Sequence, residues 1–421
     1  MKVEVTANNL IKGEVKVLSS KSELHRLLLL SGFAETESEI NYFGTLSLDV
    51  LATLNCLSAV GVKSEVLENK IKITPLKEKP TENISINCGE SGSTLRFIMP
   101  VLSALGISYT VSVSGRLNER PLSPLYELMQ NGGVSLTEKG KYPLTVKGEF
   151  NSTEIEIQGN ISSQFISGLL LAFAVSKKGG TVKVLGDFQS KPYVDITVDT
   201  IKKFGIEVIE NNNTYKVIPT SYLGKTLTAY GDWSNGAFFL SLGAMRGQTK
   251  TKGLNISSLQ GDKKVLKILK EFGANITENE NYITVNQNEL NATIIDAKDI
   301  PDLIPILSAV ASVSNGTTQV INAERLRIKE SDRIKSVVEM LNGLGATAIE
   351  KPNGIEIIGK EKLTGGKVFA YNDHRIVMSS AILSSVCINP VVIYGAEAVN
   401  KSYPDFFKEL TKLGFTVKEI K

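Results

Sequence analysis

A glycine that follows an apolar helix recurs along the whole chain, and this recurrence limits the possible folds more than any other feature. It is found at Gly61, Gly133, Gly205, Gly273, Gly345 and Gly414. Glycine suits such a place because the residue after a helix often adopts the left-handed conformation. The intervals of 68 to 72 residues divide the sequence into six related units.

A second and more apolar helix recurs at the same interval. Polar residues predict its starts at Ser20, Ser91, Ser162, Asp232, Pro301 and Tyr371. Short alternating runs of apolar and polar residues, such as Lys70–Thr74 and Gly354–Ile358, predict strands between the helices. Each unit of about 70 residues is therefore predicted to fold as β-α-β-α-β-β, which is too large for a solenoid repeat.

The length of 421 residues is too great for one ordinary hydrophobic core, so at least two domains are expected. The predicted fold class is α/β (α+β), with two similar domains of three repeats each. The chain is expected to begin partway through a repeat, because its first strands precede Ser20 and the last unit lacks its final strands.

The composition excludes several classes of function. With 47 basic and 44 acidic residues, the net charge of +3 does not favour a broad nucleic-acid-binding face. No apolar run approaches the length of a membrane span. The widely spaced Cys56, Cys88 and Cys387 are interpreted as buried thiols in a reducing compartment, so a cytoplasmic location is expected. The two histidines exclude a histidine-rich metal site.

Arginine is scarce, and its placement indicates an anion-binding site. Nine of the 47 basic residues are arginine, and three of these lie in the segment Arg325–Arg333. Eight of the nine lie at or near predicted helix starts, where the helix dipole disfavours cations, and only Arg246 does not. An anion shared by helix N-terminal amides and guanidinium groups explains this placement. A solvated, salt-bridged helix start is the alternative interpretation of Arg325–Arg333.

Nine short motifs run in order from one end of the chain to the other. They are S-K-S-E-L-H-R (20–26), G-E-S-G-S-T-L-R (89–96), N-E-R-P-L (118–122), S-S-Q-F (162–165), S-K-P-Y-V-D (190–195), I-P-D (300–302), L-R-I-K-E-S-D-R (326–333), Y-N-D-H-R (371–375) and K-S-Y-P-D-F-F (401–407). With these motifs the sequence resembles the 5-enolpyruvylshikimate-3-phosphate synthase family, the 3-phosphoshikimate 1-carboxyvinyltransferases. The resemblance covers the whole chain.

The resemblance implies the enolpyruvyl transferase fold, in agreement with the six repeats. It places repeats 1–3 in residues 20–228 and repeats 4–6 in residues 1–19 and 229–421, with the active site in the cleft between these domains. It implies transfer of the enolpyruvyl (1-carboxyvinyl) group of phosphoenolpyruvate to the 5-hydroxyl of 3-phosphoshikimate, with release of phosphate, in the shikimate pathway of aromatic amino-acid biosynthesis. We expect a monomer that acts on these small molecules without a cofactor or metal and binds neither nucleic acid nor membrane.

The resemblance also implies roles for individual residues. The catalytic residues are expected to be Lys21, Asp302, which accepts the 5-hydroxyl proton, and Glu330, which handles the proton at the enol methylene. The 3-phosphoshikimate site is expected to contain Lys21, Ser22, Arg26, Ser162, Ser163, Gln164, Ser190, Asp302 and Lys329. The phosphoenolpyruvate site is expected to contain Lys21, Gly92, Arg120, Gln164, Arg333, Arg375 and Lys401. Such a dense set of cations suits two substrates that carry two phosphates and two carboxylates.

Two positions depart from the family pattern. Glu90 stands where familiar bacterial members have an Asn, and Arg325 stands where some members have an Asn. Elsewhere in these motifs, His25 is interpreted as a bystander and His374 as a residue near the site. In Arg325–Arg333, the residues Arg327 and Asp332 are expected to shape the turn.

Three alternatives differ in what they require of the sequence. The related UDP-N-acetylglucosamine enolpyruvyl transferases commonly carry a cysteine on a mobile loop, and neither Cys56 nor Cys88 has such a context. A nucleic-acid-binding relative of the same architecture requires a broad basic face. A non-catalytic repeat scaffold does not require Asp302 and Glu330 beside the arginines.

Overall fold

The computed structural model describes residues 1–7 and 10–420. The chain forms two compact units, which we call the continuous unit (residues 19–229) and the discontinuous unit (residues 1–18 and 230–421). The predicted boundaries, after residues 19 and 228, each differ from these by one residue. Residues 8, 9 and 421, which the predicted domains include, lie outside the described residues.

The described residues form six four-stranded sheets, one for each repeat, and the predicted fold class is confirmed. In the second repeat, β6 (Ile84–Asn87) runs parallel to β7 (Tyr109–Ser112), and β9 (Leu144–Lys147) lies antiparallel between β7 and β8 (Ser135–Leu136). The order β6-β7-β9-β8 recurs in the other sheets. Each repeat therefore folds as the predicted β-α-β-α-β-β unit.

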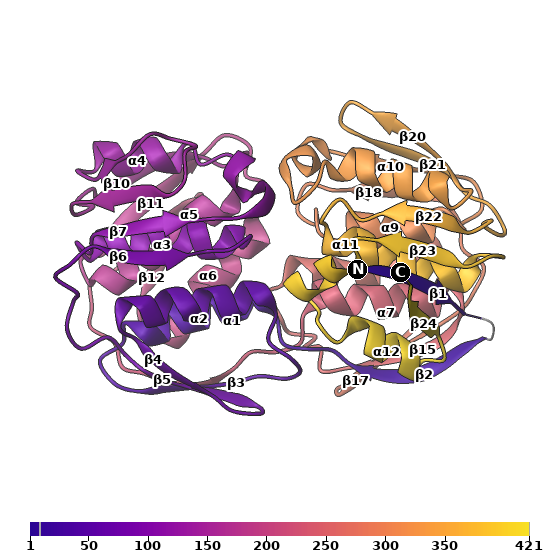
Figure 1. Cartoon of the computed structure of the whole chain (residues 1–421), viewed down its shortest axis with the longest axis horizontal. Helices are drawn as coiled ribbons and strands as arrows, with labels where there is room; N and C mark the ends of the chain where they lie inside the picture. The colour runs from indigo at the N-terminus through magenta and orange to yellow at the C-terminus, as the bar shows by residue number, and fades with distance from the viewer. Residues whose placement is uncertain (8–9, 421) are drawn as a thin grey trace. The chain divides into compact units, whose positions relative to one another are not determined.

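The continuous unit holds repeats 1–3 around one hydrophobic core (Figure 1). Its helices are α1 (Lys21–Gly32), α2 (Leu48–Val60), α3 (Gly92–Ala104), α4 (Leu125–Asn131), α5 (Ser163–Ser176) and α6 (Lys191–Lys203), with a 3-10 helix at Gly115–Glu119. Its other strands are β3 (Ser38–Asn41), β4 (Lys63–Val66), β5 (Lys70–Thr74), β10 (Glu154–Gln158), β11 (Gly180–Leu185), β12 (Val208–Asn211), β13 (Thr214–Val217) and β14 (Thr226–Thr228).

The discontinuous unit holds repeats 4–6 around a second core. Its helices are α7 (Trp233–Met245), α8 (Val265–Phe272), α9 (Ile304–Ala311), α10 (Arg333–Gly343), α11 (His374–Leu383) and α12 (Phe406–Lys412), with 3-10 helices at Gly261–Lys264, Glu324–Ile328, Ser384–Val386 and Ala396–Lys401. Its strands are β1 (Lys2–Thr6), β2 (Ile11–Lys16), β15 (Gly247–Lys252), β16 (Asn275–Glu278), β17 (Tyr282–Asn286), β18 (Ile294–Asp296), β19 (Thr317–Ile321), β20 (Thr347–Lys351), β21 (Gly354–Ile358), β22 (Gly366–Phe369), β23 (Val391–Tyr394) and β24 (Thr416–Glu419).

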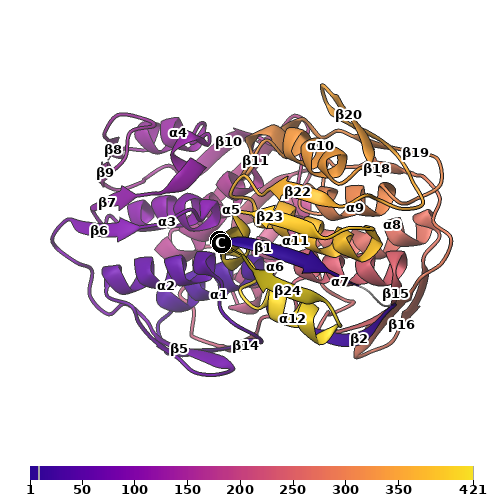
Figure 2. The same cartoon turned by 45° about the vertical axis from the view of Figure 1, so that its right-hand side comes forward.

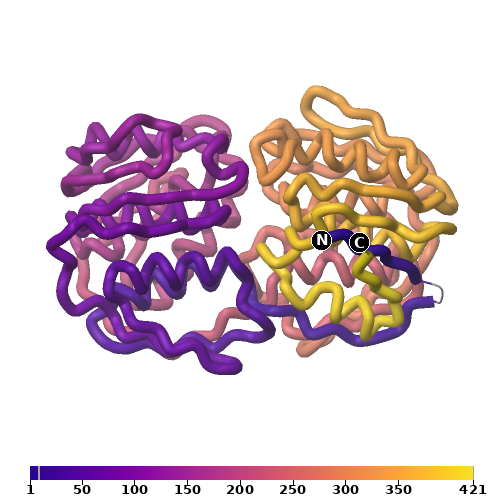
Figure 3. The backbone as a smooth tube through the Cα atoms, in the orientation of Figure 1, coloured from indigo at the N-terminus to yellow at the C-terminus, as the bar shows by residue number. Residues whose placement is uncertain are grey.

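The N-terminal strands complete sheets of the discontinuous unit, as the resemblance implied. Strand β2 leads directly into α1 but pairs with β15, whereas β14 leads into α7 but pairs with β3. In the tube of Figure 3, the indigo N-terminus lies beside the yellow C-terminal segment of the discontinuous unit. Strand β1 lies between β23 and β24 in the last sheet (Figure 2). The prediction that the last repeat lacks its final strands was partly wrong, because β24 is present and only the last strand comes from the N-terminus. Strand β24 follows Gly414, as a strand follows each of the other recurring glycines, although most of its residues are exposed.

The first helix of each repeat is buried on almost all sides, because a helix that is apolar around its circumference must lie in a core. In α5, for example, all residues from 165 to 175 are buried. The second helix is more often amphipathic: α8 buries Leu269 and Phe272 and exposes Lys267 and Lys270. Because the first helices are buried, the free amides at their N-terminal ends need polar partners.

Four predicted helix starts are confirmed. The side chains of Ser20, Ser91, Ser162 and Asp232 each accept a hydrogen bond from a backbone amide of the first helical turn. The recurring glycines after the second helices also have the expected left-handed conformation, with φ between 86° and 110°.

The other two helices begin later than predicted. Tyr371 and Asn372 have φ of 51° and 58° and form a turn, so that Asp373 becomes the N-cap of α11. Helix α9 begins at Ile304 rather than near Pro301. Its Pro305 has no amide hydrogen and therefore belongs to the first helical turn, which places the helix start after Asp302.

The structure also bears on the predictions made for the cysteines and for membrane-spanning helices. Cys56 and Cys88 are buried, as predicted, whereas Cys387 is only partly buried. In the part of the chain that the structure describes, no helix combines the length and the hydropathy needed to cross a membrane.

Candidate active site

The predicted site residues fall into one set in each unit. The continuous half-site consists of Lys21, Ser22, Arg26, Gly92, Arg120, Ser162, Ser163, Gln164 and Ser190. The discontinuous half-site consists of Asp302, Lys329, Glu330, Arg333, Arg375 and Lys401.

Lys21 is the first residue of α1 and lies directly after the N-cap Ser20. Its Nζ forms an ion pair of 2.7 Å with Oδ2 of Asp49, in the first turn of α2, and both side chains are largely buried. Asp49 holds the lysine head group in place. The sequence did not single out Asp49, because an acidic residue in the first turn of a helix is common for dipole reasons alone.

Arg26 is buried, and protein groups occupy much of its guanidinium. It donates to Thr197 Oγ1 (2.6 Å), to the backbone oxygens of Ser22 (2.6 Å) and Tyr193 (2.8 Å), and to Ser167 Oγ (3.3 Å). Burial lowers the pKa of Arg26 to about 9. The guanidinium thus ties α1 to α5 and α6 and fixes the position of Ser22 next to Lys21.

Two arginines converge on the start of α3. A Cβ atom placed on Gly92 lies 2.9 Å from Nη1 of both Arg96 and Arg120, so only glycine permits this approach. Nη1 of Arg96 donates to Oε1 of Gln164 (2.6 Å), and Nε2 of Gln164 donates to Ser93 Oγ (2.9 Å). Gly92, Arg120 and Gln164 are therefore brought together, with Arg96 as a residue that the site prediction left out. Two guanidinium groups beside helix N-terminal amides suit an anion.

The remaining predicted residues of the continuous half-site lie at two other helix starts. Ser162 is the N-cap of α5 and accepts a hydrogen bond from the Gln164 amide (3.3 Å), and Ser163 is buried at the first helical position. Ser190 is the buried N-cap of α6 and has φ of 56°, which is unusual for a residue with a side chain. Glu90, at one of the departures from the family pattern, places its carboxylate against Gly115.

Arg333 is the centre of the discontinuous half-site. Its Nε donates to Asp373 (2.8 Å), its Nη1 to Asp302 (2.6 Å) and its Nη2 to Glu330 (2.6 Å), while its side chain is 1% exposed. Burial opposes its charge, but Asp373, Glu330 and Asp302 outweigh burial and raise the pKa of Arg333 well above its usual value. Three carboxylates thus hold one arginine in a fixed orientation at the start of α10.

Asp302 lies between two guanidinium groups. It accepts hydrogen bonds from Arg333 (2.6 Å) and from Nη2 of Arg375 (3.0 Å). Burial disfavours its charge, but Arg375, Arg333 and Lys329 together hold its pKa well below the usual range of a carboxyl. Asp302 is therefore ionised at neutral pH and can accept a proton.

Lys329 lies near the same charges. Burial lowers its pKa to about 8, with Arg325 and Arg333 acting in the same direction and Asp302 and Glu330 opposing them. A lysine with this pKa exchanges protons near neutral pH and can serve in acid–base chemistry. The half-site thus contains an ionised carboxylate and a lysine with a lowered pKa beside buried arginines.

Asp373 organises this half-site, although the sequence interpretation gave it no role. Besides Arg333, it accepts hydrogen bonds from Ser331 Oγ and from the backbone amide of Arg375, both at 3.0 Å. It is fully buried and caps α11. The Y-N-D-H-R motif contained the residue, but its contact with Arg333, 40 positions away, cannot be recognised from local spacing.

Asp262 is a second carboxyl of the discontinuous unit that the sequence did not indicate. It is buried in the 3-10 helix before α8, and the hydroxyl of Ser234 donates to it. Burial, together with the nearby charge of Asp302, raises the pKa of Asp262 to about 7, against the opposing effect of Arg375. In sequence, Asp262 looks like an ordinary residue of a helix start.

Other residues of these motifs shape turns or pack in the core. Nη1 of Arg327 pairs with Asp332 (3.0 Å), and Asp332 caps α10, so both shape the turn as predicted. Nζ of Lys401 donates to the backbone oxygen of Asn372 (2.7 Å), within the Y-N-D-H-R motif. His25 is a buried core residue whose Nδ1 lies 2.7 Å from Thr53 Oγ1, and burial lowers its pKa, in agreement with a bystander role.

Comparison with known proteins identifies the family. The sequence profile of EPSP synthase (3-phosphoshikimate 1-carboxyvinyltransferase) matches residues 5–410. The chain is 40% identical over 422 residues to a 3-phosphoshikimate 1-carboxyvinyltransferase of Clostridium novyi, covering 97% of each protein. It is 40% identical to that of Clostridium kluyveri, covering 97% of this chain and 96% of the relative.

Solved structures agree on the fold. The EPSP synthase of Acinetobacter baumannii superposes with a TM-score of 0.83 at 24% identity, covering 99% of this chain and all of that one. The enolpyruvyl transferase NikO of Streptomyces tendae superposes with a TM-score of 0.79 at 14% identity, covering 99% and 98% of the two chains. The chain described here belongs to the EPSP synthase (3-phosphoshikimate 1-carboxyvinyltransferase) family.

Proposed function

We propose that this chain transfers the enolpyruvyl group of phosphoenolpyruvate to the 5-hydroxyl of 3-phosphoshikimate and releases phosphate, as the names of its relatives describe for them. The proposal rests on the position of Asp302. Arg333 and Arg375 hold its ionised carboxylate beside Glu330 and Lys329. A proton acceptor, a proton donor and anion-binding groups within one constellation are what the reaction requires.

We further propose that the two half-sites act on the same pair of substrates. The continuous half-site offers helix starts with serines and Lys21 for 3-phosphoshikimate, and Arg120 with Gln164 at Gly92 for phosphoenolpyruvate. The discontinuous half-site adds Arg333, Arg375 and Lys401. Four anionic groups held by these cations place the 5-hydroxyl near the enol carbon, and this positioning accounts for part of the rate.

The chemistry needs two proton transfers in the addition step. Asp302 takes the proton of the 5-hydroxyl while the hydroxyl oxygen forms a bond to C2 of phosphoenolpyruvate. Glu330 or Lys329 delivers a proton to the C3 methylene. In the elimination step, the bond between C2 and the phosphate oxygen breaks, and the methyl group returns one proton to the residue that delivered it, which restores the enol ether. The proton held by Asp302 leaves with the released phosphate, so each residue regains its starting protonation state.

The ion pairs of Asp302 also indicate how its basicity is controlled. Arg375 and Arg333 hold its pKa well below the usual range of a carboxyl. Anionic substrate groups that bind the same guanidiniums weaken those ion pairs, and the pKa of Asp302 then rises toward the value of an effective base. The carboxylate thus becomes a better proton acceptor when the substrates are present.

A phosphate-release assay tests the proposal. The purified chain is incubated with 3-phosphoshikimate and phosphoenolpyruvate, and inorganic phosphate and the enol ether product are measured. Equal amounts of both are expected. The second candidate function, enolpyruvyl transfer to UDP-N-acetylglucosamine, replaces the first if only that acceptor releases phosphate.

We also propose that the enzyme is a cytoplasmic monomer that needs no cofactor and binds neither nucleic acid nor membrane. Size-exclusion chromatography tests the oligomeric state, and cell fractionation tests the location.

A further inference from the structure

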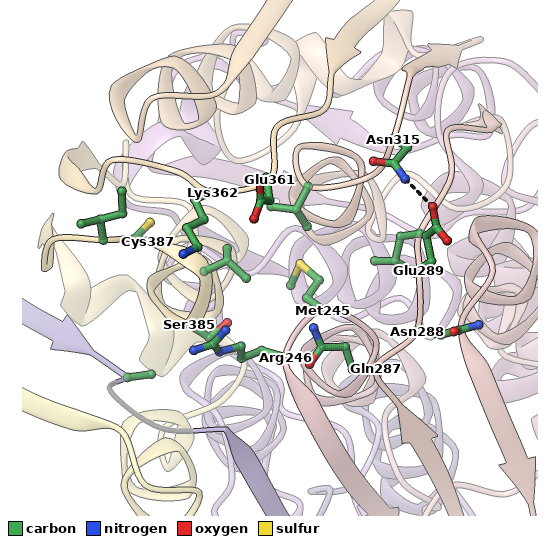
Figure 4. Close-up of a pocket in the computed structure, with 15 residues that line it drawn as sticks. Met245, Arg246, Gln287, Asn288, Glu289, Asn315, Glu361, Lys362, Ser385 and Cys387 are labelled. Carbon is green, nitrogen blue, oxygen red and sulfur yellow. Dashed lines mark hydrogen bonds between the residues drawn. The ribbon is translucent and has the colours of Figure 1, made fainter.

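A pocket of about 570 Å³ lies in the discontinuous unit, at the C-terminal ends of its three buried first helices (Figure 4). It is lined by residues that end or follow α7, α9 and α11, among them Arg246, Val313 and Val386. The candidate active site lies at the opposite helix ends, since Arg375 is in the first turn of α11. Because α11 has 10 residues, the two ends are roughly 15 Å apart. The pocket is therefore separate from the candidate active site.

Arg246 is the arginine that the anion-binding interpretation of helix starts did not explain. It is the C-cap of α7, where a cation is favoured by the helix dipole, and this is a sufficient structural reason for a positive charge. Among the described residues, however, it forms no ion pair, and its Nε is buried without a hydrogen-bond partner. A buried guanidinium N–H without an acceptor is costly, and a carboxylate bound in the pocket removes that cost.

The continuous unit provides a natural comparison. The residue that caps the C-terminus of its first helix α5 is also a cation, Lys177, and it too borders a pocket. Lys177 forms an ion pair of 3.0 Å with Glu35. Arg246, which also ends a first helix, has no such carboxylate among the residues that the structure describes.

The other charges of the pocket define the chemistry of the ligand. Arg246 and Gln287 lie on one side, and Glu361 and Lys362 on another (Figure 4). Glu289 accepts a hydrogen bond from Nδ2 of Asn315 (2.9 Å) and leaves its second oxygen for a cationic donor. Two cations and two carboxylates balance each other, so a multiply charged anion such as a phosphate is disfavoured by like-charge repulsion.

The apolar part of the lining indicates the body of the ligand. Met245, Leu290, Val313 and Val386 contribute to the wall between these charges. The volume lies within the range of pockets that bind small molecules, about 300–1,000 Å³. A ligand that fits has one carboxylate, one ammonium and a short apolar side chain.

We propose that this pocket binds a zwitterionic α-amino acid with an apolar side chain. The guanidinium of Arg246, supported by Lys362, receives the α-carboxylate in the bidentate geometry that arginine favours. The α-ammonium lies toward Glu289 and Glu361, and the side chain contacts Met245 and Val313. The proposal is independent of the transferase reaction.

Isothermal titration calorimetry with the full chain tests the proposal, using L-leucine, L-methionine and L-phenylalanine as probes. Saturable binding of at least one of them is expected, unchanged when 3-phosphoshikimate and phosphoenolpyruvate are present. Arg246→Gln is expected to weaken this binding by at least about tenfold, because it removes a charge-assisted bidentate pair. Lys177→Gln, the matched change in the continuous unit, is expected to alter it by less than about twofold, since Lys177 lies in another pocket.

Analogues of leucine separate the two charged contacts. The carboxylate without an ammonium, 4-methylpentanoate, and the amine without a carboxylate, 3-methylbutylamine, are each expected to bind more weakly than leucine. Glu289→Gln keeps the oxygen that accepts a hydrogen bond from Asn315. This variant is expected to weaken the binding of leucine but not the binding of 4-methylpentanoate. This variant also keeps the test decisive if Arg246→Gln does not fold.

Three results overturn the proposal. One is no heat of binding for any of the amino acids up to about 10 mM, which corresponds to an affinity too weak for a built site. Another is equal affinity in the wild-type chain and in Arg246→Gln or, if that variant does not fold, in Glu289→Gln. The third is saturable binding of inorganic phosphate alone, which assigns the pocket to a simple anion.

Discussion

Replacing Asp373 by asparagine changes the most buried carboxylate of the candidate active site with almost no change in shape. Its two oxygens accept hydrogen bonds from Nε of Arg333, from Ser331 Oγ and from the amide of Arg375. An asparagine side chain has only one accepting oxygen, so its NH₂ group must face either Arg333 or the Arg375 amide, donor against donor. Arg333 keeps Asp302 and Glu330 as partners but loses the carboxylate on Nε.

The magnitude follows from burial. Leaving a buried charge without any partner costs about 3–5 kcal/mol. Because Arg333 keeps two carboxylates, the expected loss is that of a charge-assisted hydrogen bond, about 1.5–3 kcal/mol. For a unit of this size, each kcal/mol lowers the melting temperature by about 2–4 °C, so a decrease of roughly 3–12 °C is expected. Differential scanning calorimetry and urea unfolding of the full chain, with the discontinuous unit followed separately where its transition is resolved, measure this loss.

Asp332→Asn is the matched control. Asp332 also pairs with an arginine and also caps a helix, but its side chain is 33% exposed and that of Arg327 is 31% exposed. An exposed ion pair contributes at most about 1 kcal/mol, and asparagine is an equally good N-cap. If Asp373→Asn destabilises the chain no more than Asp332→Asn does, Asp373 is not the residue that organises the site.

Three further predictions concern single residues. Gly92→Ala is expected to raise the KM for phosphoenolpyruvate about tenfold or more, because the new Cβ displaces two guanidinium groups, whereas an unchanged KM contradicts the proposed contact. Arg26→Lys is expected to lower the free energy of unfolding by at least about 2 kcal/mol, since one ammonium cannot replace donors to four protein groups; urea titration measures this. Lys329 has a pKa of about 8 in the folded chain and about 10.4 when unfolded, so the unfolded chain binds more protons between these values and stability rises with pH there. Lys329→Met should remove that rise in unfolding experiments at pH 7.5 and 9.5, and an identical rise in the variant refutes the assignment.

The repeat, the sheets and most helix starts could be predicted from the sequence because their signals are local. A glycine after a helix and a serine before one act through their own backbone and nearest neighbours. The start of α11 could not be placed in this way, since Tyr371 and Asn372 adopt a left-handed turn that their residue types do not require.

In the candidate site, too, some residues could be predicted from motifs and others act through contacts that only the fold creates. Resemblance to a family indicated Asp302, Glu330, Arg333 and Arg375, and the structure brings these four together. It could not indicate Asp373, because that residue acts through a contact with Arg333 that only the folded repeats create.

Asp49 and Arg96 show the same limit in the other unit. Asp49 holds Lys21 from the next helix, and Arg96 holds Gln164 from the next repeat. Each position has an ordinary local explanation, a helix dipole or a solvated arginine, and that explanation is sufficient until the partner is known. Residues that position others are therefore the part of the site that sequence reasoning misses.

We propose that Asp302 accepts the 5-hydroxyl proton while Arg333 and Arg375 hold the substrates. The most direct test is the kcat of Asp302→Asn at saturating 3-phosphoshikimate and phosphoenolpyruvate, measured as phosphate release. Because asparagine keeps the shape but cannot accept the proton, kcat is expected to fall by about 10²–10⁴-fold. A kcat within about threefold of the wild-type value shows that another group accepts this proton.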